Sequence, residues 1–261
     1  MSDLAAFAGF AEELADAARA AALRYHEGGY DAEDKSGGGV FDPVTRADRE
    51  AELAMRELIE ARFPEHGIAG EEFGVKPGDG AYSWSLDPID GTRSFICGLP
   101  TWTVLIALLD QGEPVVGVID VPRLGERFVG HGEVAELVTD AGRAPLRTSG
   151  CASLAEARLS TTDPYLFAGE ESEAFERVRR ACRMARFGLD AYSYARVAAG
   201  GLDLVIENNL KPHDYNALIP VVRAAGGAVS DWDGGEDFEQ GRVVAAASRQ
   251  LLDEAVELLS P

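Results

Sequence analysis

A change of hydrophobic period near residue 64 constrains the fold of this chain more than any other feature of its sequence. Apolar residues recur every three or four positions in residues 2–25 and again in residues 45–63, which is typical of amphipathic helices. Pro64 ends the second of these segments. The second helix is expected to bury one row of residues: Ala47, Ala51, Ala54, Leu58 and Ala61.

After Pro64 the pattern changes to short apolar or alternating runs separated by Gly and Pro turns, which is typical of strands. The runs occupy residues 66–70, 82–86, 103–109, 115–121 and 127–129. Strands joined by short turns pair antiparallel. We therefore expect two helices packed on a largely antiparallel sheet in this half of the chain.

From about residue 147 strands and helices alternate, which predicts a smaller α/β half. The expected strands are residues 158–162, 202–207, 227–230 and 242–246. The expected helices are residues 170–184, 190–199, 214–225 and a last one capped by Ser248, with Pro220 bending the third or marking its first turn. The chain is thus predicted to be an α/β protein with two halves, residues 1–145 and 146–261.

The charge balance limits the partners of the chain. It has 24 Lys and Arg against 45 Asp and Glu, a formal charge of −21, which repels nucleic acids and anionic lipid surfaces. We therefore expect neither a nucleic acid nor a membrane as partner. An anionic substrate would need a local positive centre, and bound divalent cations supply one.

The three cysteines indicate a reducing compartment. Cys97, Cys151 and Cys182 are odd in number, far apart and not spaced as a zinc or redox motif. The N-terminal segment has acidic residues and lacks the basic flank of a signal peptide, and no segment is apolar enough to span a bilayer. These features predict a cytoplasmic protein.

The most informative stretch is residues 84–92, where an apolar strand ends in Asp87 and Asp90. Pro88 stiffens the chain so that the two carboxylates can converge, and Gly91 and Thr92 can offer backbone N–H groups to an anion. Read alone, an ordinary turn explains this segment equally well, since Asp-Pro and Asp-Gly are common turn formers.

Two further acids follow the same logic. Glu71 comes directly after the predicted strand 66–70, and Asp214 lies at the start of a helix after Pro212. Read alone, a solvated loop acid is the more usual interpretation of Glu71, and capping of the helix is the alternative role of Asp214. Together with Asp87 and Asp90 they form an all-oxygen set, which favours Mg²⁺ or Mn²⁺ over zinc.

These motifs, taken in order, are similar to those of the inositol monophosphatase family: Gly70-Glu71-Glu72, residues 87–95, and Asp214 ahead of residues 224–227. Residues 44–48 also resemble the N-terminal segment of that family. The resemblance implies a layered αβαβα sandwich, a homodimer, and hydrolysis of a small phosphate monoester with two or three Mg²⁺ ions per site, Mn²⁺ being an alternative.

The resemblance also implies a set of metal ligands. Glu71, Asp87 and the Ile89 carbonyl would hold the first ion, and Asp87, Asp90 and Asp214 would hold the second. Asp87 would bridge the two.

Catalytic and phosphate-binding roles follow from the same resemblance. Thr92, supported by Asp48, would orient the attacking water together with Glu71, and the N–H groups of Gly91 and Thr92 would hold the phosphate. Lys35 matches a basic position of the family, although a solvated loop lysine explains it equally well.

Two acids in the second half would select the substrate. The inositol-specific members typically read Gly-Thr-Ala where this chain has Gly188-Leu189-Asp190, which adds a carboxylate. Glu207 lies seven positions before Asp214, so both acids would border the leaving group. Two acids there favour a cationic leaving group such as histidinol. Capping of the next helix is the alternative role for Asp190.

Three segments resemble the corresponding sequences in the histidinol-phosphate phosphatase branch of the family: residues 41–45, 217–222 and 231–235. This implies hydrolysis of L-histidinol phosphate in histidine biosynthesis. Hydrolysis of inositol 1-phosphate or another polyol phosphate is the alternative within the family, although His213 departs from its usual Trp or Tyr. A catalytically silent, metal-binding regulatory protein is the alternative from another class.

Overall fold

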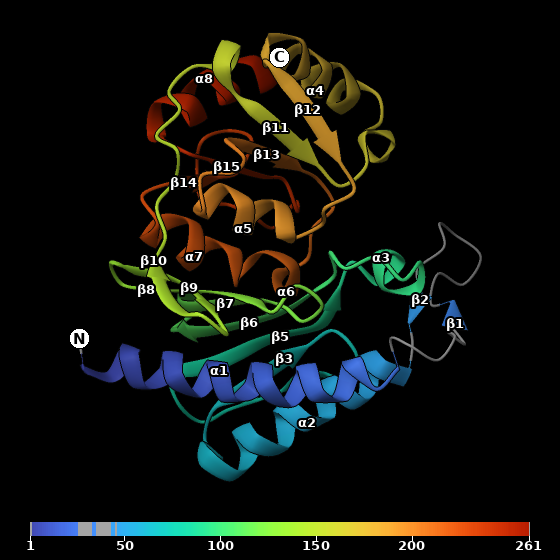
Figure 1. Ribbon diagram of the computed structural model, residues 1–261, viewed down its shortest axis with the longest axis vertical. Helices are drawn as coiled ribbons and strands as arrows, with labels where there is room; N and C mark the ends of the chain where they lie inside the picture. The colour runs from blue at the N-terminus through green and yellow to red at the C-terminus, as the bar shows by residue number, and fades with distance from the viewer. Residues whose placement is uncertain (1, 26–32, 35–42, 45, 261) are drawn as a thin grey trace.

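The computed structural model describes residues 2–25, 33–34, 43–44 and 46–260, and it has five alternating layers (Figure 1). Helices α1 (Ser2–Leu23) and α2 (Arg46–Arg62) cover one face of an eight-stranded sheet. Its other face packs on α5 (Tyr192–Ala198), α6 (Pro212–Tyr215) and α7 (Leu218–Ala224). A five-stranded sheet follows, and α4 (Glu170–Ala181) and α8 (Arg249–Leu259) close the stack. The predicted αβαβα sandwich is confirmed.

The larger sheet has the order β10-β9-β8-β7-β6-β5-β3-β4. Its strands are β3 (Gly67–Gly70), β4 (Gly74–Lys76), β5 (Tyr82–Asp90), β6 (Thr103–Asp110), β7 (Glu113–Val121), β8 (Glu126–His131), β9 (Val134–Thr139) and β10 (Gly142–Pro145). Neighbours pair antiparallel except β3 and β5, which run parallel. The largely antiparallel sheet is thus confirmed. β4, β9 and β10 were not predicted.

The smaller sheet has the order β12-β11-β13-β15-β14. Its strands are β11 (Arg158–Thr161), β12 (Met184–Phe187), β13 (Leu204–Glu207), β14 (Ala228–Ser230) and β15 (Val243–Ala246). Short elements complete the chain: β1 (Glu33–Asp34), β2 (Pro43–Val44), α3 (Thr92–Ile96) and the 3₁₀ turns Leu154–Glu156 and Pro164–Leu166.

Two helix predictions in the second half were wrong in extent. The helix expected at 170–184 ends at Ala181, because the chain turns back at Cys182 to form the edge strand β12. The helix expected at 214–225 is two helices, α6 and α7. Pro220 lies in the first turn of α7, where its missing N–H costs no hydrogen bond, as one of the two sequence interpretations required. Ser248 caps α8 by accepting from the Leu251 amide at 3.1 Å, as predicted.

Helix α2 buries a face rotated from the predicted one. Ala47, Ala51, Met55 and Ile59 are fully buried, whereas Leu58 is 37% exposed. The same face carries two acids one turn apart, Asp48 at 1% and Glu52 at 0% exposure. Buried carboxylates are rare unless they have partners or a function, so both acids require explanation.

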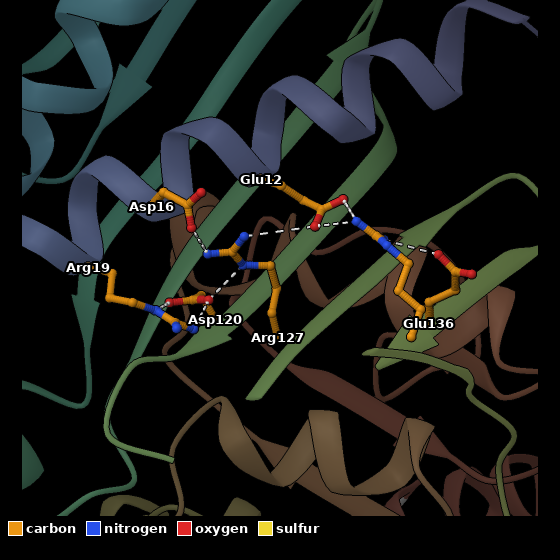
Figure 2. Close-up of polar contacts among 7 residues, drawn as sticks. Glu12, Asp16, Arg19, Asp120, Arg127 and Glu136 are labelled. Carbon is orange, nitrogen blue, oxygen red and sulfur yellow. Dashed lines mark hydrogen bonds and ion pairs between the residues drawn. The ribbon is translucent and has the colours of Figure 1, made fainter. Parts of the chain in front are cut away.

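Helix α1 is fixed to its sheet by a network of ion pairs (Figure 2). The carboxylate of Asp120 in β7, 0% exposed, accepts from Arg19 of α1 at 2.6 Å and from Arg127 of β8 at 2.7 Å. Arg127 also reaches Asp16 of α1 at 2.6 Å. The network of ion pairs continues from Arg127 to Glu12, which also pairs with Arg143 (Figure 2). Arg143 in turn pairs with Glu136.

Helix α7 lies unusually close to the larger sheet. Gly117 of β7 and Gly130 of β8 are directly paired. A Cβ at Gly117 would collide with the Ala217 carbonyl, and one at Gly130 would collide with the backbone of Val221. Glycine at both positions therefore allows the helix layer to rest on the sheet backbone.

Candidate active site

Two strands of the larger sheet end side by side in acidic residues. Because β3 and β5 are parallel, with Gly70 opposite Leu86, the residues that follow both strands lie at the same edge. The Glu71 amide donates to the Leu86 carbonyl at 3.2 Å. Glu71 therefore lies beside the end of β5 that carries Asp87.

A β-bulge turns Asp87 and Asp90 toward the same side of the sheet. Asp87 pairs with Leu105 and Asp90 pairs with Thr103, so β5 has one residue more than β6 in this stretch. Side chains three apart in a regular strand point to opposite faces, and the extra residue removes that alternation. The strand predicted to end at Leu86 therefore continues to Asp90.

Asp214 comes to these acids from the other half of the chain, on α6. Its side chain accepts from the Lys211 amide at 2.7 Å and so caps the helix. Oxygen atoms of Asp87, Asp90 and Asp214 all lie within 4.8 Å of one another, close enough to share a metal ion. Capping and metal binding are compatible, because a carboxylate has two oxygens.

The cluster is electrostatically costly in isolation. Asp87 is only 2% exposed, and burial, then the charges of Glu71 and Asp90, raise its pKa well above the ordinary value. Burial, then Asp190 and Asp214, raise the pKa of Asp90 as well. A cation between these carboxylates would relieve both effects.

The donor set fits a hard cation. Glu71, Asp87, Asp90 and Asp214 bring carboxylate oxygens to one cavity of about 400 Å³, which Ile89 also lines. Such ligands suit Mg²⁺ or Mn²⁺ better than zinc. The Ile89 amide donates to Asp87 at 3.1 Å, which fixes the backbone between the two acids of β5.

The start of α3 forms the adjoining wall of the cavity. Gly91 has φ +80°, a conformation that favours glycine, and precedes Thr92 at the first turn of the helix. The Thr92 hydroxyl donates to the Ile89 carbonyl at 3.2 Å. Asp48 lies close enough for its charge to contribute to the raised pKa of Asp87.

Asp190 lies at the cavity and does not cap α5. It adopts φ +48°, and the residue at the cap position is Ala191. Its carboxylate accepts from the Ser94 hydroxyl at 2.9 Å, and the next amide, that of Ala191, donates to Asp90 at 2.8 Å. The capping interpretation of Asp190 was therefore wrong.

Glu207, unlike Asp190, does not line the cavity. It is 3% exposed, and its carboxylate accepts from the Thr161 hydroxyl at 3.1 Å and from the Thr162 amide and hydroxyl at 2.7 and 3.0 Å. Thr162 lines the cavity with Asp190. Glu207 thus stands behind the cavity wall and fixes Thr162.

Several residues at the cavity were not predicted from the sequence. They are Arg93, Thr162, Leu166, Asn209 and Lys211. Arg93 directly follows Thr92, so proximity in the sequence could have indicated it. Lys35, predicted as a basic residue near the site, falls outside the described residues.

Comparisons with known proteins agree with this geometry. The inositol monophosphatase family matches residues 3–260. The chain belongs to the inositol monophosphatase family. It is 40% identical to the bifunctional phosphatase IMPL2 of Arabidopsis thaliana over 99% of this chain and 76% of that protein.

Relatives within the inositol monophosphatase family differ in their named substrates. A histidinol-phosphatase of Mycobacterium tuberculosis is 37% identical to this chain, over 78% of this chain and 79% of the length of that protein. The structure of an inositol monophosphatase from Zymomonas mobilis superposes with a TM-score of 0.83 at 36% identity, covering 97% of both chains. The chain is therefore a phosphatase of this metal-dependent family, which acts on small phosphate monoesters.

No helix in the part of the chain that the structure describes is both long enough and apolar enough to cross a bilayer.

Proposed function

We propose that this phosphatase hydrolyses L-histidinol phosphate to L-histidinol and phosphate, as a Mg²⁺-dependent step of histidine biosynthesis. The observation that carries the proposal is the position of Asp190, a half-buried acid that lines the cavity instead of capping α5. An acid there suits a leaving group with an ammonium and an imidazole better than a neutral polyol.

One group of residues would bind the metal ions. Glu71, Asp87, the Ile89 carbonyl, Asp90 and Asp214 would hold the ions. When bound, Mg²⁺ supplies a Lewis acid for the phosphate and lowers the pKa of water.

Thr92, with Asp48 behind it, would orient the attacking water, and the carboxylate of Glu71 would accept its proton. The backbone N–H groups of Gly91 and Thr92 would hold the phosphate in line with that water. No covalent intermediate with the protein is required.

Substrate selection would fall to the part of the cavity wall that Asp190 and Thr162 form. Asp190 would accept a hydrogen bond from the cationic leaving group, and Glu207 would support that wall by holding Thr162. A hydrogen bond to a charged partner contributes about 1.5–3 kcal/mol, so loss of one corresponds to about a tenfold to hundredfold change in selectivity.

The test is phosphate release from histidinol phosphate and inositol 1-phosphate by the native protein and by Asp190→Asn. We expect kcat/KM for histidinol phosphate to fall by about tenfold or more, with a smaller change for inositol 1-phosphate. An equal loss on both substrates would refute the role of Asp190 in selectivity. Asp140→Asn, in an exposed turn, is the control substitution.

Two other functions stay open to the same assay. The inositol monophosphatase from Zymomonas mobilis at 36% identity supports a polyol phosphate as the alternative substrate. A silent regulatory protein would bind Mg²⁺ and release no phosphate from either substrate.

We further propose a homodimer in the cytoplasm. The free thiols of Cys97, Cys151 and Cys182 support a reducing compartment, and sedimentation would give the oligomeric state.

A further inference from the structure

Glu52 is a fully buried acid outside the set assigned to the site. It lies on α2, one turn after Asp48, and is 0% exposed. Its carboxylate accepts from the backbone amides of Glu72 at 2.7 Å and Phe73 at 3.2 Å. A buried charge with two amide donors organises the backbone that supplies them.

Those two amides follow directly after Glu71. The residue before Glu71 is also in contact with Glu52, because a Cβ at Gly70 would collide with the Glu52 carboxylate. Glycine at residue 70 therefore makes room for this acid. The backbone on both sides of Glu71 is thus set by one side chain of α2.

Arg56 completes this arrangement. Its Nε donates to Glu52 at 2.7 Å, and its guanidinium also donates to the Gly74 carbonyl. Gly74 pairs with Gly70 across β3 and β4, so Glu52 and Arg56 together hold both ends of the turn that contains Glu71. Arg56 also compensates the charge of Glu52, which makes its burial tolerable.

We propose that Glu52 is a positioning residue that fixes Glu71 for metal binding beside Asp87. The inference rests on the proposed metal-dependent function and adds a residue to it. Glu52 itself is not among the residues that line the cavity. Since Asp48 is on the same face of α2, this helix would set both the acid behind Thr92 and the loop that carries Glu71.

The first test is Glu52→Gln. An amide has only one accepting oxygen, so either Glu72 or Phe73 loses its acceptor while the volume is kept. Loss of a group that orients a ligand typically weakens metal affinity by about tenfold or more. We expect that loss for Mg²⁺, followed by the Mg²⁺-dependent rise in the unfolding midpoint, and for Mn²⁺, followed by electron paramagnetic resonance.

The control is Glu57→Gln, an exposed acid on the same helix, which should keep native affinity. Activity of Glu52→Gln should recover at saturating Mg²⁺, because the ligands themselves are intact. A merely structural role would lower the unfolding midpoint equally in EDTA and in Mg²⁺ and leave the affinity unchanged, which would overturn the proposal.

Gly70→Ala gives a second test that does not depend on the folding of Glu52→Gln. The added methyl group would collide with the Glu52 carboxylate, so Mg²⁺ affinity should again fall. In a protein that already carries Glu52→Ala, adding Gly70→Ala should lower the affinity less, because the carboxylate is absent. Native affinity in both Glu52→Gln and Gly70→Ala would refute the inference alone. Absence of Mg²⁺ binding by the native protein would refute the proposed function and the inference with it.

Discussion

The carboxylate of Asp190 lies directly against the α-carbon of Gly91. A Cβ at Gly91 would come within 2.8 Å of the Asp190 oxygen. One residue belongs to the proposed phosphate cradle and the other to the wall proposed to select the leaving group. Each can occupy its position only because Gly91 has no side chain.

Gly91→Ala should therefore reduce kcat/KM by about a hundredfold, because the methyl displaces Asp190 and the phosphate-binding amides together. The measurement is steady-state phosphate release. Gly98→Ala is a matched control, since Gly98 also has a positive φ of +70° but no atom within 4 Å of the added Cβ. Equal effects of the two substitutions would indicate backbone strain alone.

Thr92 offers a test of the catalytic wall. Thr92→Val keeps the shape and removes the hydroxyl, so kcat should fall by about 10²–10⁴-fold if that group orients the attacking water. Thr92→Ser should retain most of the activity. If Val and Ser variants have the same kcat, the hydroxyl is not involved.

Glu207 predicts a pH dependence of stability. Burial raises its pKa to about 8, so the folded state holds a proton that the unfolded state releases above about pH 4.5. Its contribution is complete below that pH and is lost as pH rises toward 8. Relative to Glu207→Gln, the native protein should lose up to about 1.4 kcal/mol per pH unit in this window. Urea unfolding of both proteins between pH 5 and 8 measures it, and parallel curves would contradict it.

The network in Figure 2 predicts where a charge removal destabilises the fold. Asp120→Asn leaves Arg127, which is 7% exposed, with a weakened partner, and should cost about 3 kcal/mol in free energy of unfolding. Asp253→Asn breaks an exposed pair with Arg249 and should cost less than about 1 kcal/mol. Comparable losses would show that burial of the pair is unimportant.

Much of the fold could be predicted from the sequence because its helices and central strands follow clear periods. The period of α2 identified a helix but selected the wrong face, since Asp48 and Glu52 were not expected to be buried. The strands β4, β10 and β12 were missed because they are mostly exposed and lack an apolar run. β9 is mostly half-buried and was missed as well.

The acids of the site could be proposed from sequence because they follow strands or begin a helix. Their convergence was expected from Pro88 and from the family resemblance, but the backbone geometry that produces it was not, namely the parallel pairing of β3 with β5 and the bulge between Asp87 and Asp90. Thr162 was missed for a similar reason. Only tertiary contact with Glu207 gives it a place in the cavity wall.

Because α7 packs directly on Gly117 and Gly130, the helix layer between the sheets depends on both halves of the chain. A fragment ending at residue 145 would leave the strands of those glycines uncovered, and the remaining fragment would carry a helix with nothing to rest on. Fragment complementation is therefore expected to succeed only when both pieces are made together. Chimeras that join halves of different relatives should tolerate a mismatch at these two glycines least of all.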